Sequence, residues 1–181
     1  MTITNSTHSD TDDTFRIYVA CLAAYNNGKL HGKWIDALNN SPDEIMTEVQ
    51  AMLKESPEPD AEEWAIHDYE GFENIRLTEW EGLEQVHELA EFLNKYGCLG
   101  SEVYSYYSNL NEAYLAMTER YFGCYESIAD YAESFTAETS TIPENLAYYI
   151  DYEKMARDME MSGDIITFET AYDEVHVFWS H

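Results

Sequence analysis

The stretch RIYVACLAAYNNGKLHGKWIDA, residues 16–37, decides how the chain begins to fold. Its first part, RIYVACLAAY, starts with β-branched and aromatic residues and predicts a buried strand. Asn26-Asn27-Gly28 predicts a turn, because Asn and Gly tolerate positive φ. LHGKWIDA then predicts a second strand. The first unit therefore begins with two strands joined by a turn.

A helix and a third strand are predicted to complete this first unit. Ser41-Pro42-Asp43-Glu44 combines an N-cap serine, a proline at the first helical position and a reciprocal glutamate, so a helix should begin there. Its predicted buried face comprises Ile45, Val49, Met52 and Leu53. After a break at two prolines, EEWAIHDYEGF (residues 62–72) alternates around Trp64 and Ile66 and predicts a strand. The unit is thus a small sheet with one helix.

The pattern turns helical from Thr78 to about Thr118, with Gly97 as the expected C-cap of its first helix. Leu83, Val86, Ala90 and Leu93 form the predicted buried face of that helix. RYFGCY (residues 120–125) then predicts a strand. Helix starts are expected at Ser127, near Pro143 and at Asp151, with Ser162-Gly163 ending the last helix.

IITFETAYDEVHVFW (residues 165–179) predicts a hairpin. The expected fold class is α+β, an elongated chain of three small domains spanning 15–77, 78–118 and 119–181. Residues 1–14 are expected to be a disordered tail.

The charge is far from balanced. The 181 residues include 36 acidic and 9 basic residues, which gives a net charge of −27. Disordered acidic chains are poor in aromatic residues, whereas this one is 45% hydrophobic and 14% aromatic and should fold. Solubility of a small domain needs a net charge of only about 2 to 8 in magnitude. The excess negative charge therefore needs another explanation.

Several classes of protein are disfavoured by what the sequence lacks. Its three cysteines, Cys21, Cys98 and Cys124, form no CxxC pair, and neither a disulfide framework nor a zinc site is expected. No apolar run is long enough for a membrane span, and no signal peptide precedes the first strand, so a cytoplasmic location is expected. The nine basic residues are scattered, which argues against direct binding of nucleic acid.

Three short segments contain residue types found in catalytic or metal sites. His87-Glu88-Leu89-Ala90-Glu91 resembles HExxH but has glutamate in place of the second histidine that grips the metal. His67, Asp68 and Glu70 offer metal ligands or an acid/base pair, but alternation along a strand separates His67 from Asp68. DTDDTF (residues 10–15) lacks the glycine and distal glutamate of an EF-hand. No catalytic residue, metal or cofactor is expected.

The acidic residues recur in every unit instead of gathering in one cleft. Many lie one helical turn or less apart, with few interleaved lysines, although such pairs stabilise a helix by about 0.2 to 0.5 kcal/mol each. A fixed array of anions resembles a phosphate backbone. The carboxylates assigned to such a surface are Glu62, Glu63, Asp68, Glu70, Glu73, Glu84, Glu88, Glu91, Glu126, Asp130, Glu133, Asp151, Glu153, Asp158, Glu160 and Asp164.

Three alternatives remain open on the residues alone. The chain could be a halophile's acidic protein, an acidic metal-dependent enzyme built on His67, Asp68 and Glu70, or an acidic interaction module that is a decoy for another DNA-binding protein. The location of the charge distinguishes these hypotheses. An acidic protein of a halophile or an interaction module would carry a distributed acidic surface, whereas an enzyme needs a concave pocket with perturbed carboxylates.

Three collinear segments carry a resemblance to a known family. RIYVACLAAYNNGKLHGKWIDA, EEWAIHDYEGF and YYIDYEKMARDMEMSGDIITFETAYDEVHVFW resemble the ArdA antirestriction family over nearly the whole chain after residue 14. The resemblance implies a homodimeric, noncatalytic mimic of B-form DNA, carried on mobile elements, that occupies the DNA-binding groove of type I restriction-modification enzymes. It inhibits restriction and, by the same resemblance, can act on modification.

The resemblance also implies a dimer, for which the sequence offers an interface. RYFGCY places Tyr121, Phe122 and Tyr125 around a short strand whose edge a twofold mate would cover. A dimer with a net charge of −54, twice −27, would match about 27 base pairs at two charges per base pair.

Overall fold

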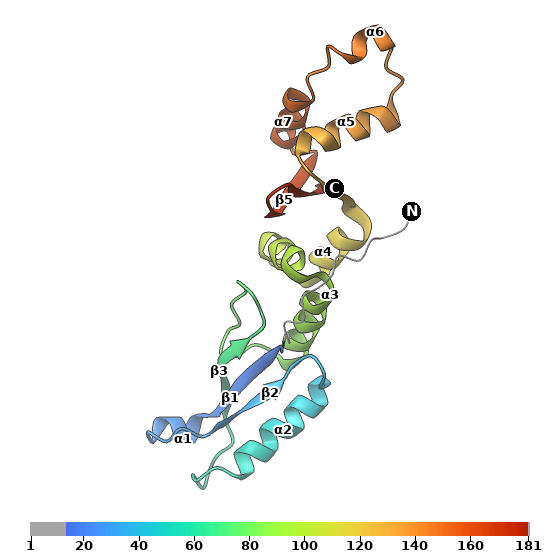
Figure 1. Cartoon of the computed structure of the whole chain (residues 1–181). Coiled ribbons are helices and arrows are strands. Elements are labelled where there is room, and N and C mark those ends of the chain that lie inside the picture. The colour runs from blue at the N-terminus through green and yellow to red at the C-terminus, as the bar shows by residue number, and fades with distance from the viewer. Residues whose placement is uncertain (1–13, 181) are drawn as a thin grey trace. The chain divides into compact units, whose positions relative to one another are not determined.

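The computed structural model describes residues 14–180 and has the α+β class expected from the sequence. Two three-stranded antiparallel sheets are accompanied by helices (Figure 1). The chain forms two compact units, Met1–Gly97 and Cys98–His181. The predicted tail at residues 1–14 lies outside the described residues, except for Thr14.

The first unit is a sheet covered by a helix. Its elements are β1 (Arg16–Cys21), α1 (Leu22–Asn26), β2 (Gly32–Asp36), α2 (Pro42–Lys54), β3 (Trp64–Glu70) and the first part of α3 (Leu83–Tyr107). The strand order is β2-β1-β3, so that β1 is the central strand. Figure 1 shows α2 lying along this sheet. Ile17, Ile35, Ile45 and Val49 are fully buried where they meet.

The predicted helix α2 forms through the predicted cap. The Glu44 backbone N–H donates to the Ser41 hydroxyl, and the Ser41 backbone N–H donates to the Glu44 carboxylate at 2.8 Å. These bonds satisfy N–H groups that the first helical turn leaves without partners. Met52 is buried as expected, whereas Leu53 is half-buried.

The first predicted strand is too long, because its second half is helical. Leu22 to Asn26 form the short helix α1. The β-branched residues end at Val19, and the Leu-Ala-Ala sequence that follows has a high helix propensity. Sheet-like pairing ends where the Leu22 N–H donates to the Glu63 carbonyl at 3.0 Å. The predicted turn follows α1, with Gly28 at a φ of 72°.

The third strand does not keep a simple alternation. Val19 pairs with Ile66 and Tyr18 with Asp68, which leaves His67 as an extra residue in β3. Such a β-bulge bends the strand and shifts which side chains face the core. Ala65 and Ile66 lie before the bulge and pair regularly with Ala20 and Val19, so they face opposite sides of the sheet, and both are buried, whereas Trp64 is half-buried.

Helix α3 buries the face predicted for it. Leu83, Val86, Ala90 and Leu93 are all buried. At Gly97 the backbone leaves helical geometry, with a φ of 56° and a ψ of −141°, before helical structure resumes. Glycine tolerates this conformation because it has no Cβ.

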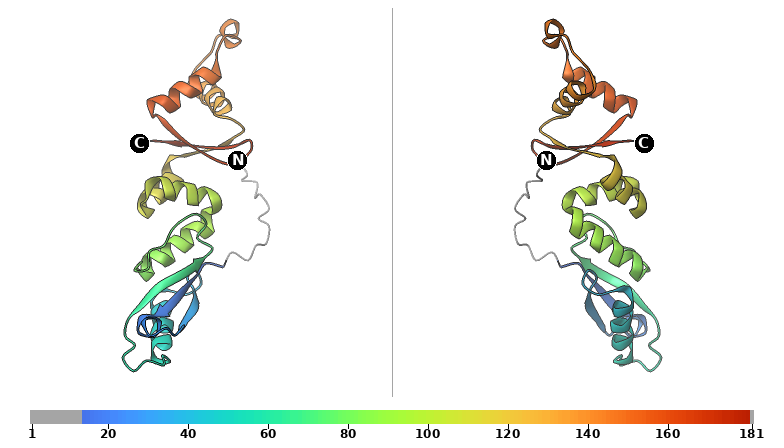
Figure 2. Two further views of the ribbon diagram at one scale, coloured as in Figure 1. Left: turned by 90° about the vertical axis from the view of Figure 1, so that its left-hand side faces the viewer. Right: turned by 90° about the vertical axis from the view of Figure 1, so that its right-hand side faces the viewer.

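The second unit pairs a sheet with two packed helices. Its further elements are α4 (Leu110–Leu115), a π-helical turn η1 (Ala116–Arg120), β4 (Tyr121–Tyr125), α5 (Ile128–Thr139), α6 (Glu144–Ala147), α7 (Tyr152–Ser162), β5 (Ile165–Ala171) and β6 (Glu174–Trp179). The strand order is β4-β6-β5. The two views of Figure 2 show α5 and α7 on the same side of this sheet, and the two helices pack together.

The caps predicted in the second unit are present. The Ser127 hydroxyl accepts from the Asp130 N–H, and the Asp151 carboxylate accepts from the Lys154 N–H at 2.9 Å. Gly163 ends α7 in the left-handed conformation, with a φ of 76°. The core beneath these helices contains Tyr131, Ile165, Val175 and Val177. The π-helical turn η1 has no counterpart among the predicted elements.

The predicted boundary at residues 77 and 78 falls within the first compact unit. One contact between α3 and the segment that follows β2 joins His87 Nδ1 to the Ala37 carbonyl oxygen at 2.9 Å. The division into three domains stays a prediction.

Candidate functional site: carboxylates on both units

All sixteen carboxylates predicted to form the binding surface belong to exposed residues. Eight lie in the first unit: Glu62, Glu63, Asp68, Glu70, Glu73, Glu84, Glu88 and Glu91. Eight lie in the second: Glu126, Asp130, Glu133, Asp151, Glu153, Asp158, Glu160 and Asp164. Solvent-facing carboxylates are what an anionic docking surface requires, and both units supply them.

Three of the nine lysine and arginine side chains form ion pairs with acids outside the predicted surface. Lys29 Nζ lies 2.6 Å from Glu58 and Lys33 Nζ lies 2.8 Å from Glu48, while Arg120 lies 3.4 Å from Glu112. The hydrogen bond from Lys29 lowers the pKa of Glu58, and the hydrogen bond to Glu48 raises the pKa of Lys33. None of the three acids belongs to the predicted surface. These cations therefore leave the charge of that surface in place.

Glu70, a member of the predicted surface, has an arginine as its partner. Arg16 Nε donates to a Glu70 carboxylate oxygen at 2.6 Å, and the same guanidinium lies 4.9 Å from the centre of the Trp34 ring. Asp68, two residues earlier on β3, accepts a 2.9 Å hydrogen bond from the Tyr69 backbone N–H. The two neighbours thus differ in how much negative charge they present.

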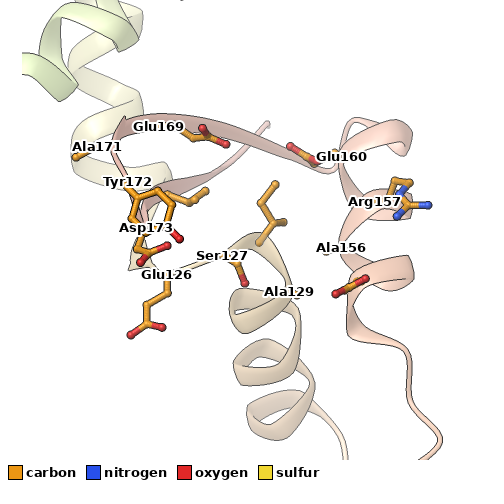
Figure 3. A pocket seen from close by; sticks show the side chains of 13 residues that line it. Glu126, Ser127, Ala129, Ala156, Arg157, Glu160, Glu169, Ala171, Tyr172 and Asp173 are labelled. Carbon is orange, nitrogen blue, oxygen red and sulfur yellow. The ribbon is translucent and has the colours of Figure 1, made fainter.

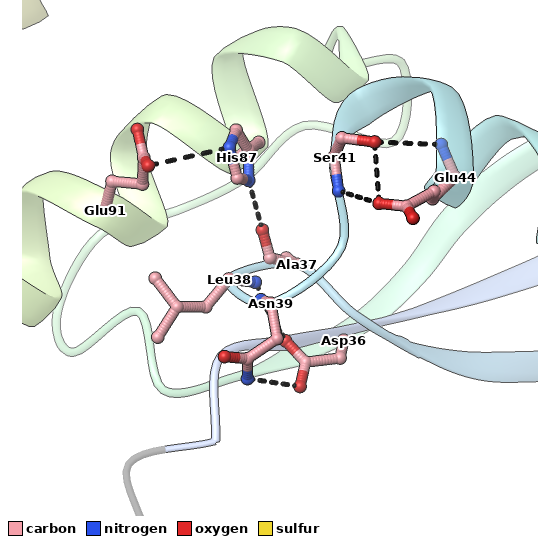
Figure 4. A network of polar contacts seen from close by, with 8 residues as sticks. All are labelled: Asp36, Ala37, Leu38, Asn39, Ser41, Glu44, His87 and Glu91. Atoms are coloured by element: carbon pink, nitrogen blue, oxygen red, sulfur yellow. Dashed lines mark hydrogen bonds and ion pairs between the residues drawn. The ribbon is translucent and has the colours of Figure 1, made fainter.

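The histidine in the HExxH-like sequence has structural contacts. Besides the bond to Ala37, His87 Nε2 lies 3.7 Å from the Glu91 carboxylate, as Figure 4 shows together with the Ser41–Glu44 cap. His87 is half-buried beside the exposed face that carries Glu84 and Glu88. These contacts support a structural role for the sequence HELAE instead of a role in binding a metal ion.

The rival metal site does not assemble. The His67 ring packs edge-on against Tyr25, with 4.6 Å between ring centres, while Glu70 engages Arg16. Within residues 14–180, no three histidine, cysteine, aspartate or glutamate side chains group closely enough to hold a metal ion. The calcium candidate DTDDTF lies mostly outside the described residues.

Some of the surface carboxylates also stabilise local structure. Asp130 accepts from the Ser127 hydroxyl at 2.6 Å, Asp164 from the Ser162 hydroxyl at 2.6 Å, and Glu160 from the Thr167 hydroxyl at 2.7 Å. Together with Asp151 at its cap, these residues have a structural role besides their charge. Glu88, Glu133 and Asp158 are the better positions for testing charge alone.

An open pocket in the second unit collects acids from three elements. Figure 3 shows it between the start of α5, the helix α7 and the β5–β6 hairpin. Three of its carboxylates, from Glu126, Glu153 and Glu160, were predicted as surface residues. Glu169 and Asp173 join them although the sequence reading missed both. The sequence could have indicated both residues, because they belong to the predicted hairpin at residues 165–179. The turn of that hairpin lies beside the start of α5 and beside α7.

The three residues predicted for the dimer interface have unequal surroundings. Phe122 is 40% exposed and lies at a β-bulge in β4, an edge strand of its sheet. Tyr121 donates to or accepts from His176 Nδ1 at 2.8 Å, and burial raises the pKa of its hydroxyl to about 12. Tyr125 packs against Tyr131 in the core. Phe122 and Tyr121, which are 40% and 37% exposed, are thus more available than Tyr125 for a contact with a second chain.

Comparison with known proteins gives the family. In the described part of the chain, every helix is too short or too polar to cross a membrane. Among curated proteins, none matches the chain. The family model for the antirestriction protein ArdA, however, matches residues 17–174. The chain therefore belongs to the ArdA family of antirestriction proteins, which are inhibitors of type I restriction-modification rather than enzymes.

Proposed function

We propose that this chain inhibits a type I restriction-modification enzyme by placing its carboxylates where DNA phosphates would bind. The observation that carries the proposal is the exposure of all sixteen carboxylates, on both units, while most of the ion-paired cations contact other acids. A groove that binds DNA is lined by cations that contact phosphates. Such a groove attracts any surface of complementary charge.

The same proposal explains why the chain keeps an acidic surface that destabilises its folded state. A net charge of −27 works against compaction by self-repulsion, and the chain offsets it with only a few interleaved lysines. The two cores are nevertheless well formed, with Ile17, Val86 and Val177 fully buried. The folded cores hold the charges in fixed positions, which a disordered acidic tract would not do. Fixed positions reduce the ordering cost of binding.

We also propose that two copies act together, through β4 and Phe122. A free edge strand presents unpaired N–H and C=O groups, and a second copy is one way to cover it. The dimer would carry a charge of −54, twice −27, which equals that of about 27 base pairs. Its site of action is the cytoplasm, where a restriction enzyme meets incoming DNA.

The test is an inhibition assay with a purified type I enzyme. DNA cleavage and DNA methylation are both measured as the chain is added, because the enzyme uses one groove for both reactions under this proposal. We expect both to fall, and we expect DNA and the chain to exclude each other from the enzyme. A ternary complex with DNA seated normally in the groove would contradict groove occupancy.

A matched pair of triple variants separates surface position from net charge. The first carries Glu88→Gln, Glu133→Gln and Asp158→Asn. The second carries Glu55→Gln, Glu119→Gln and Glu138→Gln, which are exposed acids outside the predicted surface. Each variant loses three negative charges. We expect the first to inhibit clearly less than the second, whereas equal losses would mean that only net charge matters.

A further inference from the structure

An open apolar pocket lies in the first unit where α3 begins. It has a volume of about 520 Å³, and its apolar lining comes from Met46, Trp64, Trp80 and Leu83. The Trp80 residue is 69% exposed. Tryptophan normally buries a large part of its area in a core or an interface. An indole left in solvent beside a pocket therefore marks a candidate contact surface.

The backbone around Trp80 is held by hydrogen bonds. The Thr78 hydroxyl donates to the Glu81 carboxylate at 2.8 Å, and the Glu81 N–H donates to the Thr78 carbonyl at 3.2 Å. On the other side, the Ile66 N–H of β3 donates to the Glu79 carbonyl at 3.0 Å. Trp80 thus lies on a turn that is stabilised by hydrogen bonds within the turn and by a hydrogen bond to β3. A contact residue presented in this way loses little freedom on binding.

The charged residues of the pocket are all acidic. Glu62, Glu63, Glu79 and Glu81 line it together with the apolar residues. The start of α3 contributes a partial positive charge of about half a unit, which four carboxylates outweigh. The occupant that matches both parts is a cation with an apolar body and a flat face. Arginine has this combination, because its guanidinium stacks on aromatic rings and its stem packs on apolar groups.

We propose that this pocket receives an arginine side chain from the DNA-binding surface of the type I enzyme. This inference rests on the proposed function, since it takes the occupant from that partner. Arginines that hold DNA phosphates are bound by charge and hydrogen bonds. Here the same arginine also stacks on the Trp80 indole. The chain thereby gains a contact that phosphates cannot offer and that salt screens less than a charge pair.

The first experiment measures the affinity of the full-length chain for the type I enzyme at low and high salt. Trp80→Ala should weaken binding by about tenfold or more at both salt concentrations, as truncation of an aromatic interface anchor does. Trp80→Phe should lose less, because a ring remains for stacking. The control is Leu30→Ala, which removes an 81% exposed apolar side chain elsewhere in the same unit and should leave binding unchanged.

The second experiment needs no enzyme and uses hexa-arginine and hexa-lysine peptides as probes. Calorimetric titration should show wild type binding hexa-arginine more tightly than hexa-lysine, and Trp80→Ala should remove that preference. Circular dichroism checks that Trp80→Ala is folded. We expect it to fold, because the Trp80 side chain is largely exposed and contributes little to the core. Equal binding of both peptides by wild type would overturn the inference, because charge alone would then explain binding.

The outcomes separate this inference from the proposed function. If wild type excludes DNA from the enzyme but Trp80→Ala binds as tightly as wild type, the pocket inference is wrong and groove occupancy stands. If wild type does not exclude DNA, the proposed function fails, and an arginine from that enzyme's DNA-binding surface fails with it as the occupant.

Discussion

The guanidinium of Arg16 neutralises Glu70 locally, through a hydrogen bond of 2.6 Å between β1 and β3. Asp68, on the same strand, accepts from a backbone amide instead. The two carboxylates therefore form a natural comparison. We expect Asp68→Asn to weaken inhibition more than Glu70→Gln, because only the first removes a charge that the surface presents in full. Inhibition constants of the two variants, measured at one salt concentration, check this.

Removing the cation gives the converse result. Arg16→Gln frees the Glu70 carboxylate and makes the chain more negative. Inhibition should be kept or strengthened, while the free energy of unfolding falls by at most about 1 kcal/mol, as for other surface ion pairs. A loss of inhibition by folded Arg16→Gln would mean that Arg16 itself contacts the partner.

No single carboxylate of the surface should be indispensable. Because many charges share the contact, neutralising Glu88 or Asp158 alone should weaken inhibition by only a few-fold, and losses should accumulate as substitutions are combined. Sites more than about 10 Å apart usually contribute additively to free energies. Inhibition constants for single, double and triple variants test this. Abolition by one substitution in a folded protein would point to a discrete site.

The sequence predicted best those elements whose signals are local. The capping box at Ser41, the cap at Asp151 and the glycine that ends α7 all depend on residues within one turn of each other. The apolar face of α3 follows from a regular period of 3.6 residues. At these positions the helix propensity, the apolar pattern and the capping residues all indicate the same structure, so the prediction from local sequence is correct.

The sequence predicted poorly what depends on pairing between distant segments. The bulge at His67 arises from the register between β1 and β3, and the residues next to His67 do not indicate this change of register. The short helix α1 was missed because its apolar residues continue the apolar run of β1. Glu70 was counted as free charge because its partner, Arg16, is 54 residues away. The Trp80 pocket also needs residues from three separate segments.

The dimer proposal gives a prediction for Phe122. The ring lies 5.2 Å from Trp179 and 5.5 Å from Tyr131, and it is partly exposed on an edge strand. Phe122→Asp places a charge at that edge and should favour monomers, with weaker inhibition. Sedimentation measures the mass. Tyr172→Asp is the control, because Tyr172 is 92% exposed on the β5–β6 turn. An unchanged mass in folded Phe122→Asp would place the interface elsewhere.

His176 makes the stability of the second unit depend on pH. Burial lowers its pKa below the usual value of 6.5, against a smaller opposite effect of Glu174. The ring nitrogens lie 2.8 Å from the Tyr121 hydroxyl and 3.0 Å from the Thr170 hydroxyl. Because the unfolded chain takes up the proton at a higher pH, protonation favours unfolding as the pH falls from 6.5 to the folded pKa. Stability from this group is therefore lost on acidification.

The check compares wild type with His176→Gln, whose amide can keep hydrogen bonds but does not titrate. Urea unfolding is followed at pH 7.5 and 5.5. Other carboxylates titrate in both proteins, so the difference between them isolates His176. We expect wild type to lose more stability than the variant between the two pH values. Parallel curves would show that the histidine titrates alike in the folded and unfolded chains.

Salt separates mimicry from most alternatives. If the chain replaces DNA in a cationic groove, its affinity for the enzyme should fall as salt rises, because screening weakens the complementary charges. The slope should be shallower than that of DNA, since a protein surface lacks the condensed counterions whose release drives much of DNA binding. At high salt the chain should therefore displace DNA more effectively than at low salt. Equilibrium competition between a labelled duplex and the chain, over a series of salt concentrations, measures both slopes. An affinity independent of salt would contradict charge mimicry, because the sixteen exposed carboxylates would then contribute little to binding.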